Sequence, residues 1–304
     1  MGQYLQSVAK RLIALLCVLG IAACVPLQKS DPKIRLGFTT QNFLPMVPVS
    51  AASAKQFISY ARAEGFSWIE LRDPDVSLMR DECSDIAAFA AQNGIKVLYS
   101  MQRGLLAEDF DEKFEKAFEN IVLFDGPKVA RVLALQGSGE LGWNEAEMFR
   151  MVDRATRAAK LAASRGYRLM IENADAVLDG SGKGCFGMTQ LLDAVSPSIE
   201  LQLDTANLFT GPEPVSPEDA EAFVRRYVQR ISYVHLKSAR DRKAQPVLCG
   251  NPLSLDVILD LLSSDGFSPY VAIELASGDA SAEQVYKNMR ISREWLLSEQ
   301  VLDQ

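Results

Sequence analysis

The strongest constraint on this chain is a regular alternation of short apolar runs and longer amphipathic segments, which extends from residue 34 to residue 304. The runs are rich in Val, Ile, Leu and Tyr and show little polar alternation before their last residues, as is typical of parallel strands buried on both faces. The eight runs begin at Ile34, Ser67, Ile95, Val129, Arg168, Ile199, Ile231 and Tyr270.

The segments between the runs have the spacing and the end signals of helices. Residues 110–122 place their apolar side chains on one face. Ser216-Pro217-Glu218-Asp219 supplies a cap, a proline at the first helical position and acidic residues in the first turn. In a further helix the apolar face is expected to consist of Phe149, Val152, Ala155, Ala159 and Ala162.

Eight strand-and-helix units predict an α/β fold, a single (β/α)8 TIM barrel over residues 34–304. With 48% hydrophobic and 23% charged residues, the chain can bury a large core. An open, doubly wound sheet is the alternative. It usually has fewer strands and a glycine-rich turn after the first, whereas the turn here reads TTQNFLPM.

The N-terminus has the pattern of a bacterial lipoprotein signal peptide. Lys10 and Arg11 precede an apolar run that is short for a bilayer span, and the run ends in Ile-Ala-Ala before Cys24. This ending resembles a lipobox, in which the cysteine is acylated and becomes the new first residue. An ordinary signal peptide, with Cys24 incidental, is the alternative.

On the lipoprotein interpretation, residues 1–23 form the signal peptide and residues 24–33 a tether. The mature protein is then exported and held at a bacterial membrane, in the periplasm, by acyl chains on Cys24. The chain has five cysteines and no C-x-x-C spacing, so a cysteine metal site is not expected.

Three carboxylates and the only histidine stand at the ends of the last four runs, as Glu172, Asp204, His235 and Glu274. The C-terminal ends of barrel strands meet at one rim. Taken singly, each is more typical of a solvated rim residue or a core histidine, but four in register favour a site. Carboxylates buried side by side resist ionisation, and a cation removes that difficulty. The set predicts one divalent metal, Mn²⁺ first, with Mg²⁺, Co²⁺ or Zn²⁺ as alternatives.

These motifs resemble those of the xylose-isomerase-like TIM barrels, a superfamily of sugar-phosphate isomerases and epimerases with endonuclease IV relatives. The resemblance covers the whole mature chain and rests on IEN at Glu172, LDTAN at Asp204, YVHLK at His235 and IEL at Glu274. It implies that the four residues bind one metal and that Glu172 and Glu274 also transfer protons.

The sequence departs from the family pattern in two places, and each departure limits which members of the family it resembles. Many epimerases have a substrate-contacting histidine three residues after the aspartate, where this chain has Asn207, which can hydrogen-bond a hydroxyl but cannot titrate. The endonuclease branch needs several histidines, and this chain has one. Its net charge of −7 also disfavours a nucleic-acid partner.

Other residues that follow the predicted strands are weaker candidates, and each is also typical of a solvated loop. Glu70 could face the barrel interior, Gln102 follows the third predicted strand, and residues 179–187 could form a lid or only a loop. The residues expected to bind substrate are Arg72, Gln136, Asn207, Lys237 and Arg240.

The favoured function is a metal-dependent sugar isomerase or epimerase, or a lyase of 3-keto-glycosides. Metal-held enediolate oxygens would permit proton transfer at carbon, with Glu172 and Glu274 on opposite sides of the substrate. A free carbohydrate or polyol is expected, because phosphorylated sugars are unusual outside the cytoplasm. A hydrolase that uses metal-bound water and a non-catalytic sugar-binding surface lipoprotein remain as alternatives.

Overall fold

The structure is a computed structural model that describes residues 35–134, 142–173, 178–179, 186–211, 215–249, 255–264 and 270–298. The expected signal peptide and tether, with Cys24, lie outside the described residues, as does Gln136. Among the residues that are described, no helix is both long and apolar enough to cross a bilayer.

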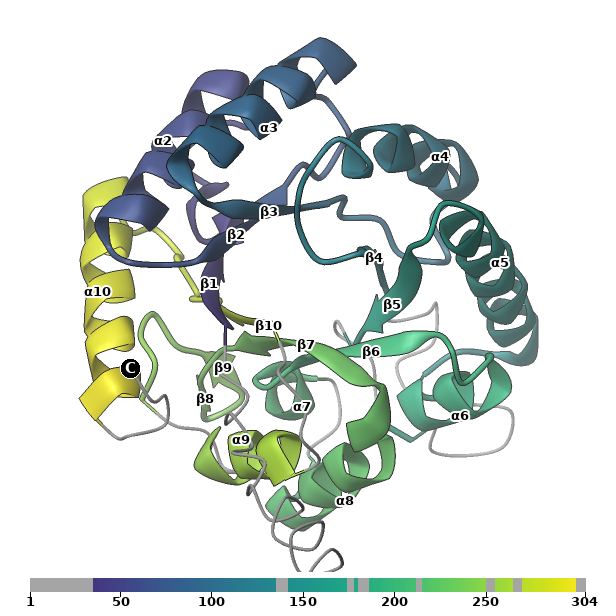
Figure 1. The fold of residues 1–304 in the computed structure, drawn as a ribbon. Coiled ribbons are helices and arrows are strands. Elements are labelled where there is room, and N and C mark those ends of the chain that lie inside the picture. Colours follow the sequence, from purple (N-terminus) through teal and green to yellow (C-terminus); the bar gives the residue numbers. More distant parts are fainter. Residues whose placement is uncertain are drawn as a thin grey trace, which may run out of the picture. The chain divides into compact units, whose positions relative to one another are not determined.

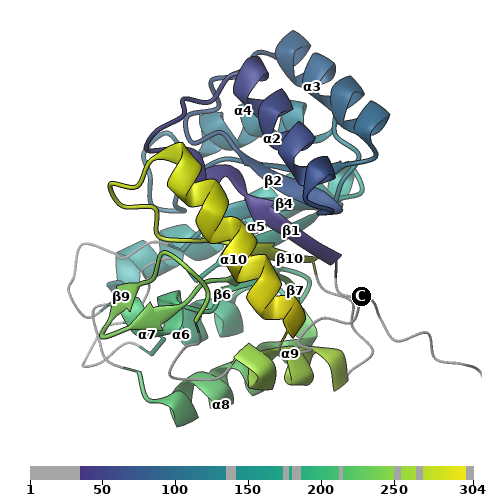
Figure 2. The same ribbon diagram turned by 90° about the vertical axis from the view of Figure 1, so that its left-hand side faces the viewer.

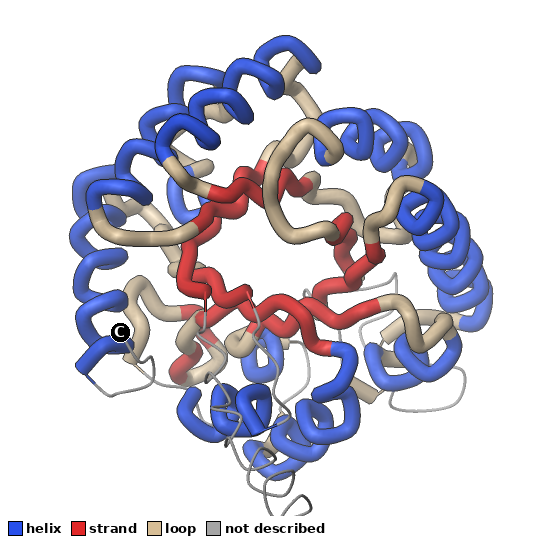
Figure 3. Tube along the Cα trace, viewed as in Figure 1, coloured by secondary structure: helices blue, strands red, loops and turns tan. Residues whose placement is uncertain are grey.

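Eight parallel strands form the centre of the molecule, in the spatial order β3-β2-β1-β10-β7-β6-β5-β4. Figures 1 and 3 show them as a ring. The strands are β1 (Arg35–Thr39), β2 (Trp68–Arg72), β3 (Lys96–Ser100), β4 (Val129–Leu133), β5 (Arg168–Glu172), β6 (Glu200–Asp204), β7 (Ile231–Leu236) and β10 (Tyr270–Ile273). All eight predicted strands are present, and the (β/α)8 barrel is confirmed.

The ring closes through the segment that follows β3. The backbone N–H of Leu133 donates to the carbonyl of Arg103, and the N–H of Leu105 donates to the carbonyl of Leu133, at 3.2 and 3.0 Å. These bonds give the outer edge of β4 a partner at the mouth of the barrel, so its polar backbone groups are satisfied there.

Helices cover the outside of the ring, as Figure 1 shows along the barrel and Figure 2 from the side. Short 3-10 turns and a two-strand ribbon on the loops complete the described part of the chain. The elements are η1 (Thr40–Phe43), α2 (Ala51–Ala63), α3 (Arg80–Asn93), α4 (Phe110–Ile121), α5 (Glu145–Ser164), α6 (Met188–Ala194), α7 (Asn207–Thr210), α8 (Pro217–Tyr227), η2 (Val228–Arg230), β8 (Ala239–Arg240), β9 (Lys243–Ala244), α9 (Leu255–Ser264) and α10 (Ala282–Ser298).

The predicted helix signals hold for α4 and α8 and, apart from Phe149, for α5. The α8 helix begins at Pro217 with Ser216 as its cap, and the predicted face of α4 is buried. In α5 the prediction that Phe149 faces the core is wrong, because its side chain is 77% exposed. The buried face contains Met148 and Met151 together with Ala155 and Ala162 of the predicted face. Alanines of this helix lie on several of its sides, so the spacing of apolar residues alone does not define which face is buried.

The lower interior of the barrel is a closed apolar layer. Its buried members are Trp68, Leu98, Val129, Met170, Tyr233 and Ala272. Gly37 on β1 makes room for the largest of them, since a Cβ there would lie 2.5 Å from the Trp68 carbonyl oxygen and 2.6 Å from its indole ring. This layer supports the polar groups nearer the mouth and separates them from the opposite end of the barrel.

Candidate metal centre and active site

Four neighbouring strands bring the predicted ligands to one rim. Glu172 and Asp204 are the last residues of β5 and β6, His235 is next to last in β7, and Glu274 follows β10 directly. These strands are adjacent in the order β10-β7-β6-β5. Parallel strands in register therefore place all four side chains at the C-terminal mouth of the barrel.

Three of the four residues form a compact set of donors. Glu172, Asp204 and His235 are buried, and each offers one atom within 4.8 Å of the others. Glu274 reaches the same place through the histidine, with its Oε2 2.9 Å from Nδ1 of His235. That Nδ1 is also 3.7 Å from Oε1 of Glu172. Two carboxylates thus face Nδ1 directly, and Asp204 belongs to the same compact group.

Three cations from the chain itself surround these carboxylates. Nζ of Lys237 lies 2.8 Å from Oε1 of Glu274 and 3.5 Å from Oδ2 of Asp204. Arg131 forms an ion pair with Glu172. Nη2 of Arg72 is 3.5 Å from Oε2 of Glu274. Together they offset much of the negative charge that burial makes costly.

The charges in the cluster move the pKa values of Glu274 and Asp204 in opposite directions. Burial raises the pKa of Glu274, but Lys237 and His235 outweigh it, and the pKa lies well below its usual range. For Asp204, burial together with the charge of Glu274 outweighs Lys237, and the pKa is raised. Burial lowers the pKa of His235, but Glu274 and Glu70 outweigh it, and the pKa is raised. Protons and metal would compete for these groups.

The donor set fits a divalent metal. It combines hard carboxylate oxygens with one imidazole nitrogen, the mixture that Mn²⁺, Mg²⁺, Co²⁺ and Zn²⁺ accept. Oε2 of Glu172 pairs with Arg131, and Oε2 of Glu274 lies against His235 and Arg72. A carboxylate oxygen has more than one lone pair, so these contacts leave lone pairs for a cation. Glu172, Asp204 and His235 would hold the ion, with Glu274 beside them.

Below the rim lies a polar layer that sequence reasoning largely missed. Its buried members are Glu70, Ser100, Arg131, Gln202 and Tyr233. The available signal was the period of a strand, since Gln202 and Tyr233 stand two residues before Asp204 and His235 and so share their face. Glu70 was expected to face inward as a weaker candidate, and it does. Arg131 could have been noticed as a charged residue inside an apolar strand.

The residues expected to bind substrate do not all lie in the cluster. Arg72 and Lys237 lie in the cluster. Asn207 is buried beside it, and its backbone N–H donates to Oδ1 of Asp204 at 3.0 Å. Arg240 lies on β8 with its side chain exposed, and no ion pair joins it to the cluster in the part of the chain that the structure describes. Gln136 is outside that part.

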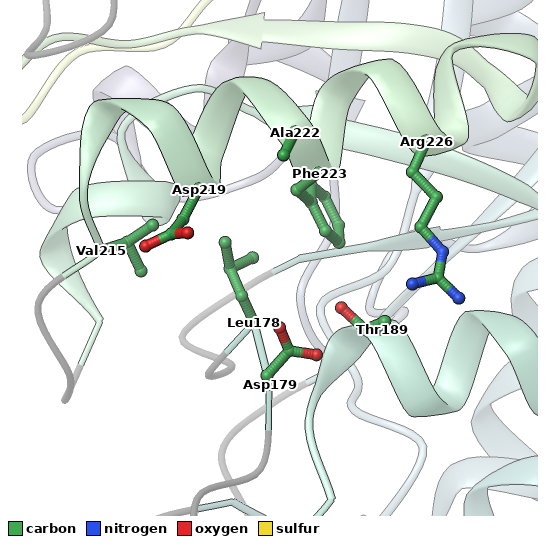
Figure 4. Close-up of a pocket in the computed structure, with 8 residues that line it drawn as sticks. All are labelled: Leu178, Asp179, Thr189, Val215, Asp219, Ala222, Phe223 and Arg226. Carbon is green, nitrogen blue, oxygen red and sulfur yellow. The ribbon is translucent and has the colours of Figure 1, made fainter.

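A separate cavity of about 270 Å³ lies between α6 and α8. Figure 4 shows Asp219, Ala222, Phe223 and Arg226 on the side of α8 that faces it, with Thr189 of α6 opposite. None of the four predicted metal ligands lines this cavity. The chemistry of the cluster therefore belongs to the barrel mouth and not to this hollow.

Comparison with known proteins agrees with the fold. Residues 58–297 match the family model described as the xylose isomerase-like TIM barrel. The chain therefore belongs to the xylose isomerase-like TIM barrel family, as the sequence motifs predict. No curated protein sequence matches the chain.

Solved structures with the same fold include two sugar epimerases. One is D-psicose 3-epimerase with D-tagatose from Clostridium cellulolyticum H10, with 13% identity, a TM-score of 0.63, and coverage of 87% of this chain and 99% of that one. Another is D-allulose 3-epimerase from Methylomonas sp. in complex with D-allulose, with 16% identity, a TM-score of 0.65, and coverage of 88% and 97%.

A third is a xylose isomerase-like TIM barrel protein from Mycobacterium smegmatis in complex with magnesium, with 16% identity, a TM-score of 0.64, and coverage of 89% and 97%. At these identities the likeness shows a shared fold. What these proteins bind or catalyse is a property of each of them.

Proposed function

We propose that this protein is a divalent-metal-dependent isomerase or epimerase of a small keto sugar, or a lyase of a 3-keto-glycoside. The observation that supports it is the clustering of Glu172, Asp204 and His235 at the mouth of the barrel, with Glu274 against Nδ1 of the histidine. A site with two glutamates, one metal-binding set and cations around it suits the movement of a proton to and from a carbon beside a carbonyl.

The metal, when bound, would polarise the substrate carbonyl and so acidify the neighbouring C–H bond. Glu172 and Glu274 stand at the ends of β5 and β10, with β6 and β7 between them. Their carboxylates can therefore approach a small ligand from two sides. One glutamate removes the proton, and the other returns a proton to the same carbon or to its neighbour.

Each of the three cations of the cluster has a role in the proposed reaction. Arg131 is buried below Glu172 and fixes the direction of its carboxylate. Lys237, beside Glu274 and Asp204, can donate to a substrate hydroxyl or to oxygen on which negative charge develops. Nε of Arg72 is buried and has no hydrogen-bond partner among the described residues, so a hydroxyl of the substrate can satisfy it.

A free sugar is the proposed substrate class. Fold relatives have been crystallised with D-tagatose and D-allulose, which are small ketoses. Mn²⁺ is the proposed metal because carboxylates outnumber the single imidazole in the site. Mg²⁺, Co²⁺ and Zn²⁺ are the alternatives for the same donors.

The metal site is tested by measuring metal in purified protein. Wild-type protein is expected to retain about one ion per chain, and His235→Ala is expected to lose it, since the imidazole is the only nitrogen donor of the set. Glu221→Gln, on the exposed surface of α8, serves as the control and should retain the metal. Equal metal content in wild type and His235→Ala would refute the assignment.

The reaction itself is tested by exchange of substrate C–H with D₂O. A panel of free ketoses and 3-keto-glycosides is incubated with Mn²⁺-loaded protein, and deuterium incorporation is followed by NMR. Exchange at a carbon beside the carbonyl, lost in His235→Ala, is the expected result. Hydrolysis of a substrate without exchange would favour a hydrolase instead.

We also propose that the protein is exported and anchored to a bacterial membrane through acylated Cys24. The support is the sequence alone, a charged start and an apolar run that ends in Ile-Ala-Ala before the cysteine. Labelling of cells with a radioactive fatty acid is expected to mark the wild-type protein but not Cys24→Ser. Labelling that persists in Cys24→Ser would exclude this anchor.

A further inference from the structure

The two ring nitrogens of His235 face different groups. Nδ1 faces the ligand carboxylates, 2.9 Å from Oε2 of Glu274 and 3.7 Å from Oε1 of Glu172. Nε2 faces deeper into the barrel, 2.8 Å from Oε2 of Glu70 and 2.8 Å from the hydroxyl of Tyr233. A metal takes a ring nitrogen that has no proton, and the hydrogen bond of the other nitrogen decides which one that is.

Glu70 can only accept a hydrogen bond at this position. It is fully buried, and the hydroxyl of Ser100 donates to its Oε1 at 2.6 Å. Nη2 of Arg72 is 3.4 Å from its Oε2, and Nε of Arg131 is 3.6 Å from its Oε1. A carboxylate between two guanidinium groups is ionised and has no proton to give. The proton between Glu70 and His235 therefore sits on Nε2.

The remaining neighbours of the ring support the same arrangement. The hydroxyl of Tyr233 donates its single proton to Oε2 of Glu70 at 2.8 Å, so it offers only lone pairs to Nε2. The amide nitrogen of Gln202 lies 2.9 and 3.1 Å from Nδ1 and Nε2. A position so near both nitrogens is over the ring face, because in the plane it would collide with ring carbon. Gln202 is therefore not the in-plane partner of Nδ1, which is Oε2 of Glu274 at 2.9 Å. In the metal-free protein a proton lies between Nδ1 and this carboxylate, and a metal that binds both groups would displace it, whereas the proton that Glu70 holds on Nε2 stays.

The contact also spans the barrel. Glu70 is on β2 and His235 on β7, and β1 and β10 lie between these strands. Because the contact joins two strands that are not neighbours, it fixes the imidazole ring relative to β2 as well as to β7. Since the histidine is the only one in the chain, no other imidazole can replace it.

We propose that Glu70 is a positioning residue, which holds the proton of His235 on Nε2 and makes Nδ1 the nitrogen that binds the metal. The inference rests on the proposed metal site and adds to it the identity of the ligating atom and of the residue that selects it. Carboxylates that orient a metal-ligating histidine typically contribute about 10–100-fold to metal affinity.

The single histidine makes a direct test possible. Full-length protein with ¹⁵N-labelled histidine, purified through a tag that lacks histidine, gives one pair of ring nitrogen signals. In the wild type loaded with diamagnetic Zn²⁺, two-bond ¹H–¹⁵N correlation spectra are expected to show a protonated Nε2 and a Nδ1 shifted by the metal. A protonated Nδ1 with the metal on Nε2 would overturn the proposal, and this result needs no variant.

Two variants separate Glu70 from its neighbour. Glu70→Gln retains the shape but can donate from its amide to Nε2, so it no longer selects one proton position. Its Mn²⁺ affinity, measured by calorimetry, is expected to fall about 10–100-fold, with circular dichroism unchanged. Tyr233→Phe removes the other group near Nε2 and is expected to change affinity less. The opposite ranking of the two variants would assign the positioning role to Tyr233.

Failure of this inference can be told from failure of the proposed function. In metal-free wild type, a strong hydrogen bond to Glu70 should give a downfield, slowly exchanging Nε2 proton, which shifts in Glu70→Gln. If wild type binds no metal but shows that proton, the proposed metal site fails while the Glu70 contact stands. If wild type binds metal and Glu70→Gln binds it equally well, the Glu70 inference fails while the metal site stands.

Discussion

The two ends of the barrel interior bury side chains of opposite character, apolar at the bottom and charged at the mouth. At the bottom, Trp68, Met170 and Val129 fill an apolar layer, and Gly37 has no side chain that would collide with the indole. At the mouth, four carboxylates with Glu70 included, two arginines and a histidine are buried together beside a partly buried lysine. Burial of apolar surface stabilises the fold, whereas burial of like charges costs stability unless other groups offset it.

This difference indicates that the bottom of the barrel interior provides stability and that its mouth provides function. The bottom layer would pack equally well in a barrel with any activity, since it touches no substrate. The mouth retains charges that only a bound cation and a polar ligand can fully satisfy, which is typical of a functional site. Substitutions at the bottom should therefore change the free energy of unfolding, and substitutions at the mouth should change turnover and metal affinity.

The largest effect is expected at the mouth, for Glu274→Gln. The amide keeps the shape and one oxygen for the metal but cannot accept the proton. Turnover should fall about 10²–10⁴-fold, while the metal content stays close to wild type. Single-turnover rates and metal analysis on the same sample check this. Wild-type exchange of the substrate proton by metal-loaded Glu274→Gln would show that Glu274 is only a ligand.

Glu172→Gln is the matched variant for the other glutamate. It should lose turnover to a similar degree, because either proton transfer limits the whole reaction when its base is missing. Each variant also leaves a cation, Lys237 or Arg131, without its charged partner, so the free energy of unfolding should fall by about 1–3 kcal/mol in both. A large loss of stability, with turnover per folded molecule intact, would break the proposed division between the two ends.

The next largest effect is expected at the bottom, for Trp68→Ala. Truncation of a fully buried aromatic side chain typically costs about 3–5 kcal/mol of unfolding free energy. Chemical denaturation followed by circular dichroism measures it. Metal content per folded molecule should remain as in the wild type, because Trp68 lies a full layer below the ligands. Loss of metal from folded Trp68→Ala would show that the two ends are coupled.

Much of this fold was predictable because each strand is buried on both faces. Such strands appear in the sequence as continuous apolar runs, and all eight predicted runs became strands. On α5, Ala155 and Ala162 of the predicted face are buried, but the direction of that face at the start of the helix was not predictable, since alanine fits the core and the surface equally well. Phe149 was therefore assigned to the wrong side.

The site was predictable only at strand ends. Glu172, Asp204 and Glu274 are charged residues that directly end apolar runs, and the structure brings them together around His235. The partners of these residues depend on which side chains meet across the barrel, and sequence separation conceals that. Glu70 and His235 are 165 residues apart and in contact. Arg131 likewise pairs with Glu172 from another strand, β4, at whose end no candidate metal ligand was predicted.

A smaller effect is expected for Lys237→Met, which removes a cation from the mouth. In metal-free protein, Glu274 and Asp204 lose a buried partner, and the free energy of unfolding should fall by about 1–3 kcal/mol. Saturating Mn²⁺ should restore most of this loss, since the ion replaces the missing positive charge and also stabilises the form that binds it.

Thermal unfolding with EDTA and with Mn²⁺ measures both states of Lys237→Met. The increase in melting temperature on metal addition should be larger in this variant than in the wild type, because the ammonium no longer competes for the carboxylates. Lys55→Met, which removes a surface ion pair with Asp85, is the control and should show no such difference. An equal increase in all three proteins would mean that Lys237 does not share the carboxylates with the metal.

The smallest effect is expected far from both ends, for Arg225→Ala on α8. Arg225 and Glu221 form an ion pair one turn apart, with side chains 58% and 35% exposed. Water already solvates both charges, so the pair should contribute only about 0.3–0.5 kcal/mol, and less at high salt. Denaturation at low and at high ionic strength, with Glu221→Ala and the double variant, measures the pair through a mutant cycle. A coupling energy well above 1 kcal/mol that persists in salt would show that charge pairs stabilise this barrel outside its mouth, and the contrast between an apolar base and a charged mouth would then no longer describe how its stability is distributed.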